Sequence, residues 1–285
     1  TACQSEDSKT ARTSQGFEII FHENNKGTTP KHEDYVTFNL LVKDGDRKLQ
    51  SSYDRGQPEA IRINDLDNGT QQSKNWVQDA LLQMSEGDSV TVLFPIDSLK
   101  GRPPGTSPDA KFFDCHIKLV KIFESETAYQ DYAKGLLQVK REAAMKVQAR
   151  LPEIADLVKN TLADYKAGKI SNLQKTDSGL EYVIHEEGSG PQAVNNNTLK
   201  VQYYGALKSD GSMFDASFTR GDPITVLLGQ GQVISGWDEG LSYLKEGSKA
   251  TFFIPYTLAY GEAGRPPSIP EKADLVFYVE LESVK

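Results

Sequence analysis

The sequence predicts an α+β chain in which two strand-rich domains of one duplicated fold are joined by a helical segment. Three observations lead to this. A central segment made of good helix formers separates two outer segments rich in strand and turn signals. The outer segments repeat the same motifs in the same order. The length of 285 residues fits about two domains, each long enough to bury its own core.

Residues 1–15 form a polar amino-terminal tail that we expect to be disordered, because few of its side chains could enter a core. Its start, Thr1-Ala2-Cys3, resembles a bacterial lipoprotein processing site, in which small residues precede a lipidated cysteine. The resemblance implies acyl chains on Cys3 that anchor the protein without spanning the membrane. It also implies an extracytoplasmic protein, a lipoprotein of the bacterial outer membrane or one facing the periplasm. The alternative is a stray surface cysteine.

The first domain is expected over 16–124 and the helical linker over 125–170. Alanine, leucine, lysine, glutamate and glutamine dominate the linker, and its apolar residues recur at close to helical spacing. Pro152 removes a backbone donor, so we expect two helices, at about 126–150 and 153–167. The glycine that follows, Gly168, suits a carboxy-terminal cap.

The outer segments are expected to be diverged copies of one unit, the second over 171–285. Each contains a Glu-Gly turn, a β-rich run ending in proline, a glycine, an Arg-Pro-Pro and a final β-rich strand. Shared order over such a length indicates duplication, so both copies should have the same fold. The parallel runs are Glu86–Pro95 and Glu246–Pro255, with Arg102-Pro103-Pro104 and Arg265-Pro266-Pro267.

Composition excludes several classes of protein. No apolar run approaches the roughly 18 residues that a spanning helix needs. The net charge of −8 and the lack of a basic cluster argue against nucleic acid as a partner. Two distant cysteines, Cys3 and Cys115, exclude a disulfide framework, and Cys115 lies in an apolar alternation typical of a buried thiol. The four histidines lack ligand spacing, and no motif points to a metal or a cofactor.

Aromatic residues beside turns stand out near the carboxyl end. Their motifs are Val201-Gln202-Tyr203-Tyr204-Gly205, Phe214-Asp215-Ala216-Ser217, Val233-Ile234-Ser235-Gly236-Trp237 and Ala259-Tyr260-Gly261. In this order and with these gaps they closely resemble the FKBP-type peptidyl-prolyl cis-trans isomerases, over about Gly179 to Lys285. The resemblance implies two FKBP-like domains, each an antiparallel sheet wrapped around a short helix. It also implies a shallow apolar pocket that admits one proline side chain.

The resemblance assigns a role to each residue of this pocket. Tyr260 would donate a hydrogen bond to a substrate carbonyl, and Asp215, held by Tyr203 or Arg220, would lie near the twisting amide. These are the two expected catalytic residues. Substrate would be bound by Trp237 at the floor, by Tyr203, Phe214, Val233, Ile234 and Phe277 as walls, and by Ile269 from the Pro-rich loop. No cofactor and no metal are implied.

Four positions depart from the commonest family pattern. Ile224 replaces a frequent aromatic residue, and Arg265 replaces a frequent histidine. Ser268 replaces a frequent aliphatic residue, and Gln232 replaces a frequent glutamate. We expect these changes to affect sequence preference and affinity for macrolide inhibitors of the rapamycin or tacrolimus type, more than the basic activity.

The first domain resembles the same fold with its pocket lost. Phe38 stands near the equivalent of Tyr203, Leu49-Gln50-Ser51-Ser52 replaces the Phe-Asp motif, and Val77 falls at the Trp237 position, with Trp76 one place away. Lys100 stands where Tyr260 does, and Cys115 is expected opposite Phe277. This domain should be inactive as an isomerase. It either binds chain segments or serves as a spacer.

The predicted function is peptidyl-prolyl cis-trans isomerisation that accelerates the folding of extracytoplasmic proteins, with proline-containing polypeptides as partners. The alternative is a non-catalytic periplasmic chaperone or peptide-binding adaptor. The apolar residues of 126–167 could form a homodimer or pack against one of the protein's own domains, and both possibilities stay open.

Overall fold

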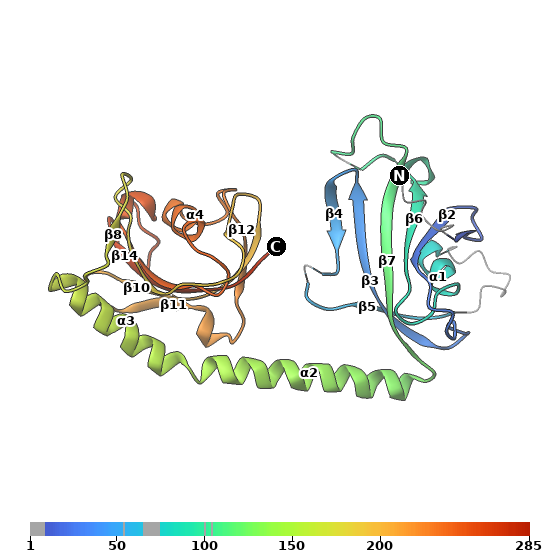
Figure 1. Ribbon diagram of the computed structural model, residues 1–285, viewed down its shortest axis with the longest axis horizontal. Coiled ribbons are helices and arrows are strands. Elements are labelled where there is room, and N and C mark those ends of the chain that lie inside the picture. The colour runs from blue at the N-terminus through green and yellow to red at the C-terminus, as the bar shows by residue number, and fades with distance from the viewer. Residues whose placement is uncertain (1–8, 54, 65–74, 100, 104) are drawn as a thin grey trace, which may run out of the picture. The chain divides into compact units, whose positions relative to one another are not determined.

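The computed structural model describes residues 9–53, 55–64, 75–99, 101–103 and 105–285. The chain divides into two compact units, with the division between Leu136 and Leu137. Each unit contains a seven-stranded antiparallel sheet and one short helix against it (Figure 1). The α+β fold class and the two-domain organisation are therefore confirmed.

The first sheet has the strand order β1-β2-β6-β7-β3-β4, with β5 also paired to β3. The short helix α1 and the 3₁₀ helix η1 belong to the same unit. The elements are β1 (Thr10–Arg12), β2 (Glu18–Glu23), β3 (Tyr35–Asp44), β4 (Arg47–Ser51), β5 (Glu59–Arg62), α1 (Trp76–Leu81), β6 (Ser89–Pro95), η1 (Ile96–Ser98) and β7 (Phe112–Phe123).

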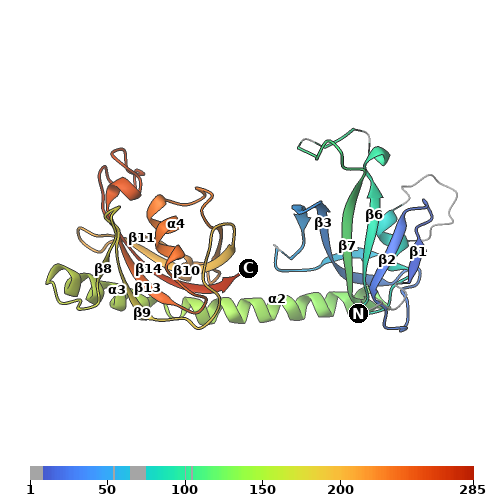
Figure 2. The same ribbon diagram turned by 45° about the horizontal axis from the view of Figure 1, so that its top comes forward.

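The second sheet has the order β8-β9-β13-β14-β10-β11, with β12 also paired to β10, and it curves around α4 (Figure 2). The elements are β8 (Gln174–Lys175), β9 (Glu181–Glu186), β10 (Thr198–Leu207), β11 (Met213–Ala216), η2 (Ser217–Thr219), β12 (Ile224–Leu227), α4 (Ser235–Ser242), β13 (Lys249–Ile254), η3 (Tyr256–Leu258) and β14 (Leu275–Val284).

The two sheets have the same topology, element for element. Both also carry a register shift at the same place, between Thr37 and Phe38 in β3 and between Lys200 and Val201 in β10. A bulge inserts one residue and bends the strand, so its repetition at the equivalent position is a specific match. The predicted duplication of one fold is confirmed.

Two helices, α2 (Glu126–Gln148) and α3 (Leu151–Lys166), follow the first sheet. They lie close to the predicted ranges. Pro152 is in the first turn of α3, where its missing N–H removes no helical hydrogen bond. Gly168 ends α3 with a φ of +66° and donates its N–H to the carbonyl of Tyr165, as expected for a glycine cap.

The helix α3 packs on the outer face of the second sheet. Its buried side chains, Ile154, Val158 and Leu162, join a hydrophobic cluster with residues of β9, β10, β13 and β14. At the junction before α3, the guanidinium of Arg150 donates two hydrogen bonds, of 3.0 and 2.5 Å, to the buried carboxylate of Glu280. A bidentate pair of this kind fixes orientation as well as adding energy. Because of these contacts, α3 is part of the second folding unit.

The inner face of each sheet holds the main core, with the short helix packed against it. In the first unit this core includes Cys115, which is 2% exposed, and burial raises the pKa of its thiol to about 12. The prediction of a buried core cysteine is confirmed. Among the described residues, no helix combines the length and apolarity needed to cross a membrane.

The structure differs from one prediction about the amino terminus. Thr10–Arg12, within the tail expected to be disordered, pairs with β2 as β1, and Ala11 packs against the core. A sheet edge offers unpaired backbone groups, so even a polar segment can add to it. Cys3 and Lys100, to which the sequence assigned roles, lie outside the described residues.

Candidate active site: an aromatic pocket in the second domain

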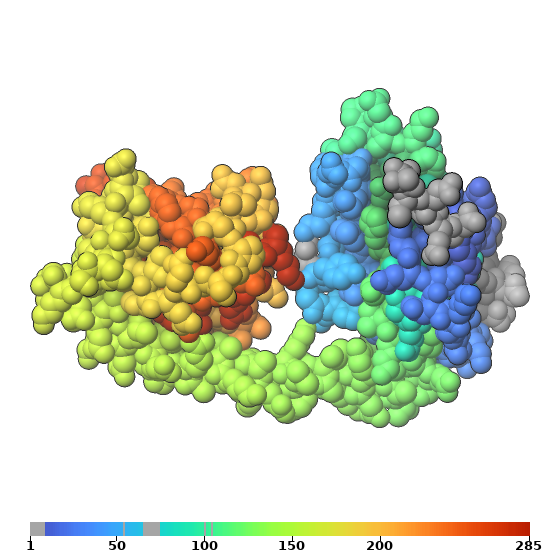
Figure 3. All heavy atoms as spheres, viewed as in Figure 1, coloured from blue at the N-terminus to red at the C-terminus, as the bar shows by residue number. Residues whose placement is uncertain are grey.

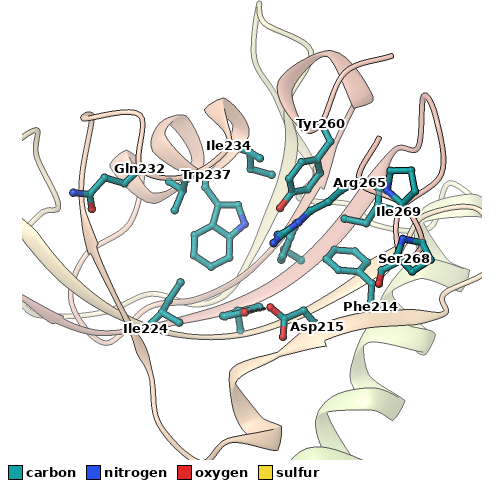
Figure 4. Close-up of a pocket in the computed structure, with 15 residues that line it drawn as sticks. Phe214, Asp215, Ile224, Gln232, Ile234, Trp237, Tyr260, Arg265, Ser268 and Ile269 are labelled. Atoms are coloured by element: carbon teal, nitrogen blue, oxygen red, sulfur yellow. Dashed lines mark hydrogen bonds between the residues drawn. The ribbon is translucent and has the colours of Figure 1, made fainter. Parts of the chain in front are cut away.

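A pocket of about 460 Å³ opens between the inner face of the second sheet, α4 and the loop after η3 (Figure 4). Fifteen residues line it. The structure brings together in it all nine residues that the sequence predicted as catalytic or substrate-binding: Tyr203, Phe214, Asp215, Val233, Ile234, Trp237, Tyr260, Ile269 and Phe277. The four departing positions, Ile224, Gln232, Arg265 and Ser268, also line it.

Trp237, which is 3% exposed, forms the floor. The rings of Tyr203 and Phe277 meet it edge-on, at centroid distances of 5.3 and 5.2 Å and interplanar angles of 83° and 84°. Phe214 meets Phe277 edge-on in the same way, at 5.5 Å. Each such pair adds about 0.5–1.5 kcal/mol beyond the burial of its area. These contacts hold the apolar walls in one arrangement before any ligand binds.

Two glycines bring α4 close enough to the sheet to place Trp237 there. A Cβ on Gly236 would lie 2.5 Å from Cγ2 of Ile254, and one on Gly240 would lie 2.9 Å from the ring of Phe252. Both separations are shorter than real Cβ contacts allow. The glycines of the Gly-Trp-Asp-Glu-Gly segment therefore set the depth of the pocket floor.

The indole N–H of Trp237 is buried and has no hydrogen-bond partner among the described residues. A buried donor without a partner costs about 1–3 kcal/mol. The indole that forms the pocket floor therefore carries one buried polar group in an apolar setting.

Asp215 belongs to a three-residue network at the pocket wall. The Tyr203 hydroxyl donates to one oxygen of its carboxylate, and the Arg220 guanidinium donates to the other at 2.8 Å and to the Tyr203 oxygen at 2.8 Å. Partial burial acts to raise the pKa of Asp215, but the hydrogen bonds from Tyr203 and Arg220 outweigh it and lower the pKa. Burial, followed by the bond to the carboxylate, raises the pKa of Tyr203 to about 12. At neutral pH this wall presents a fixed carboxylate and a neutral phenol.

Ser217, for which the sequence motifs predicted no role, holds this network in place. Its hydroxyl accepts from the backbone N–H of Tyr203 at 2.7 Å and donates to the side-chain carbonyl of Gln202 at 2.5 Å. The first domain repeats the arrangement with Ser52, which accepts from the N–H of Leu40 at 3.0 Å. The serine shared by the two copies was the signal that could have shown its importance.

Tyr260 lies across the pocket from this network. It is half-buried, and its hydroxyl points into the pocket (Figure 4). Among the described residues the hydroxyl makes no hydrogen bond to the protein, so it is free to donate to a ligand. No three His, Cys, Asp or Glu side chains of the described chain lie close enough to hold a metal ion.

The equivalent positions of the first domain have lost the aromatic lining. The serine contacts and strand pairing place Leu40 at the position of Tyr203, so the expectation for Phe38 is wrong by two residues. Leu40 and Phe38 lie two residues apart, so both side chains face the core. The alternation of side chains along a strand therefore cannot tell which of the two matches Tyr203. Two other predicted counterparts agree with the pairing: Gln50 with Asp215, and Cys115 with Phe277.

Comparison with known proteins supports this geometry. The family model of the FKBP-type peptidyl-prolyl cis-trans isomerases matches residues 190–282. The peptidyl-prolyl cis-trans isomerase FPR2 of Saccharomyces cerevisiae is 44% identical over 119 residues, which cover 42% of this chain and 86% of the relative. The chain belongs to the FKBP-type isomerase family. Its second domain is an FKBP-type peptidyl-prolyl cis-trans isomerase domain.

Longer matches reach beyond the FKBP domain. The FKBP-type isomerase FkpA of Aeromonas hydrophila is 37% identical over 191 residues, 66% of this chain and 63% of that protein. This chain thus spans under two thirds of that relative's length. The crystal structure of FkpA from Escherichia coli aligns with a TM-score of 0.40 and 36% identity over 56% of this chain and 75% of that one.

Proposed function

We propose that the pocket of the second domain binds X-Pro segments of unfolded chains and accelerates rotation about the prolyl bond. The observation that carries this proposal is the edge-on packing of Tyr203 and Phe277 against a buried Trp237. Together these rings form an apolar pocket for a compact ring such as proline.

The chemistry needs no nucleophile or general base. Rotation about an amide bond is opposed by resonance, with a barrier of about 18–20 kcal/mol, and unaided X-Pro bonds interconvert in tens to hundreds of seconds. The twisted amide has lost its conjugation and is less charge-separated than the planar one. An apolar pocket therefore disfavours the planar ground state relative to the twisted form, and catalysis is differential binding of the latter.

We assign the catalytic contacts to Tyr260 and Asp215. The hydroxyl of Tyr260, which has no hydrogen-bond partner among the described residues, would donate to a substrate carbonyl and fix the segment as the bond turns. Asp215 would act as a fixed charge beside the twisting amide, because its hydrogen bonds to Tyr203 and Arg220 already keep it ionised and oriented.

The test is a peptide isomerisation assay on the full chain and two variants. Tyr260→Phe and Asp215→Ala should each lower kcat/KM by about tenfold, the effect of losing one hydrogen bond or charge contact of about 1.4 kcal/mol. Tyr243→Phe is the matched control, because Tyr243 is exposed and does not line the pocket. Wild-type rates in both pocket variants would remove these roles, and a wild-type chain without turnover would overturn the proposed function.

We propose that α2 mediates a homodimer. None of the 23 residues of α2, whose atoms are light green in Figure 3, is buried. Four of its apolar side chains are exposed: Leu136, Leu137, Val139 and Met145. Light scattering on the full chain should give twice the monomer mass, and Leu137→Glu together with Val139→Glu should return the monomer. A monomeric wild-type chain would contradict the proposal.

We also propose an extracytoplasmic location with a lipid anchor on Cys3, as the first three residues suggest. The isomerases named FkpA come from bacteria, which fits a bacterial lipoprotein. Mass spectrometry of the protein purified from its own membranes would detect the acyl chains, and a free thiol at Cys3 would exclude the anchor.

Macrolide binding is a separate proposal for the same pocket. A rapamycin- or tacrolimus-type ligand would occupy the aromatic floor and block the peptide, with an affinity set by the departing residues at Ile224, Gln232, Arg265 and Ser268. The proposal is checked by measuring the Ki with which either compound inhibits isomerisation in the peptide assay.

A further inference from the structure

The loop after η3 presents a charged side chain to the pocket from a fixed frame. The backbones of Arg265 and Ile269 exchange two hydrogen bonds, of 2.8 and 3.0 Å. Ile269 is 2% exposed and anchors the loop in the core. Gly264 has a φ of +63°, and a Cβ there would lie 2.2 Å from the carbonyl oxygen of Pro270. The close approach permits no side chain, so the backbone position of Arg265 is fixed.

From this frame the side chain of Arg265 extends into the pocket beneath Tyr260 (Figure 4). Its guanidinium carbon lies 5.9 Å from the centroid of the Tyr260 ring, within the range of a cation–π contact. That contact holds the guanidinium beside the hydroxyl proposed to bind the substrate carbonyl.

The charges that line the pocket do not cancel. Asp215 and Arg265 are the charged residues among the fifteen that line it. Asp215 is already neutralised by Arg220, at 2.8 Å. Within the described chain, no carboxylate forms an ion pair with Arg265, and Glu262, three residues earlier in the sequence, is paired with Lys272. The pocket of a chain with a net charge of −8 thus carries one uncompensated positive charge.

We propose that Arg265 is a specificity-determining residue that selects X-Pro segments with a carboxylate side chain next to the proline. The inference rests on the proposed function and names the substrate class of that site. A proline ring on Trp237 brings no counter-charge, so the flanking side chain is the group that meets the guanidinium. The planar fork of arginine matches a carboxylate in two parallel hydrogen bonds, which a glutamine or lysine side chain cannot accept in the same way.

The experiment uses the full chain and tetrapeptides that differ only beside the proline. Glutamate, glutamine and lysine are compared at the residue before proline and, in a second series, at the residue after it. In at least one series the glutamate peptide should have a kcat/KM about two- to fivefold above the glutamine peptide, the range of a partly exposed ion pair. The lysine peptide should fall below the glutamine peptide. The glutamate preference should shrink from 0.05 to 1 M salt, because screening shortens the reach of the charge.

Variants locate the source of the preference. Arg265→Gln should bring the glutamate-to-glutamine ratio to about one, Arg265→Lys should retain part of it, and Arg265→Glu should invert it in favour of lysine. Lys169→Gln is the control for net charge, since Lys169 is exposed and lies outside the pocket lining. It should keep the wild-type ratio.

The inference and the proposed function fail in different ways. A wild-type chain that turns over a leucine-proline peptide, but does not distinguish glutamate from glutamine in either series, overturns the inference alone. So does a glutamate preference that persists in Arg265→Gln or disappears in Lys169→Gln. A wild-type chain that turns over no peptide overturns the proposed function itself.

Discussion

Gly205 gives the sharpest test of how the pocket is built. It lies on β10, paired with both Asp215 and Phe277. A Cβ at this position would lie 2.6 Å from Cε1 of Phe277, 2.8 Å from Cζ of Phe214 and 2.9 Å from Cε2 of the same ring. The Gly205→Ala substitution therefore forces two wall rings of the pocket to move.

The magnitude follows from how little room those rings have. Phe277 is 4% exposed and is held edge-on by both Trp237 and Phe214, so it cannot rotate away without losing those contacts. Overpacking of a close-packed core costs about 1–3 kcal/mol. For a unit the size of residues 137–285 that corresponds to a fall in Tm of about 2–12 °C. The displaced rings should also lower kcat/KM, because Phe214 and Phe277 line the pocket proposed to bind the prolyl bond.

Urea denaturation and the peptide assay on the same preparations measure both effects. Gly135→Ala is the matched control. Gly135 lies inside α2 with no atom within 4 Å of an added Cβ, so alanine there should stabilise its helix by up to about 1 kcal/mol. Wild-type stability and activity in Gly205→Ala would refute the argument that the close approach of β10 shapes the pocket.

Three further predictions use the same assays. The activity should be independent of pH between about pH 5 and 9. The pKa of Asp215 is lowered, so the carboxylate loses its charge only as pH falls below the unfolded pKa of about 3.9, and the pKa of Tyr203 is raised, so the phenol loses its proton only as pH rises towards 12. A pH–rate profile with a midpoint near neutrality would contradict this. Ile154→Ala, which empties a buried site under α3, should destabilise the second unit by about 2–5 kcal/mol in urea while leaving substrate preference unchanged. A fragment of residues 137–285 should match the full chain in kcat/KM, and a much slower fragment would show that the first domain contributes to catalysis.

The sequence was informative about the site because each aromatic motif lies beside a turn with a fixed gap to the next one. The order and gaps of these motifs carry the resemblance to the FKBP family, and that resemblance implied that Tyr203, Trp237 and Tyr260 line one pocket. The helices were predictable for a different reason. Helix propensity, Pro152 and Gly168 act locally and need no knowledge of the tertiary fold.

What the sequence did not reveal depends on contacts between distant strands. The bulge at Val120 of β7, opposite Thr37 and Phe38, shifts the register by a residue, and no hydrophobic pattern marks where a bulge falls. Ser217 binds a backbone N–H fourteen residues earlier in the chain, and a small polar residue after a strand normally indicates only a turn. The strand Thr10–Arg12 has too little apolar character to be expected from its own residues.

A contact repeated in both domains has a practical consequence for protein engineering. A serine hydroxyl accepts from a backbone N–H of the long strand, Ser52 from Leu40 on β3 and Ser217 from Tyr203 on β10. The first domain keeps the serine contact that fixes the strand geometry but lacks the aromatic rings that line the pocket of the second domain. The residues that set the fold are therefore different from those that line the pocket. The first domain is thus a ready scaffold of the correct shape. Transplanting the missing rings and the carboxylate onto its matching positions should be a shorter route to a second working centre than redesigning any backbone.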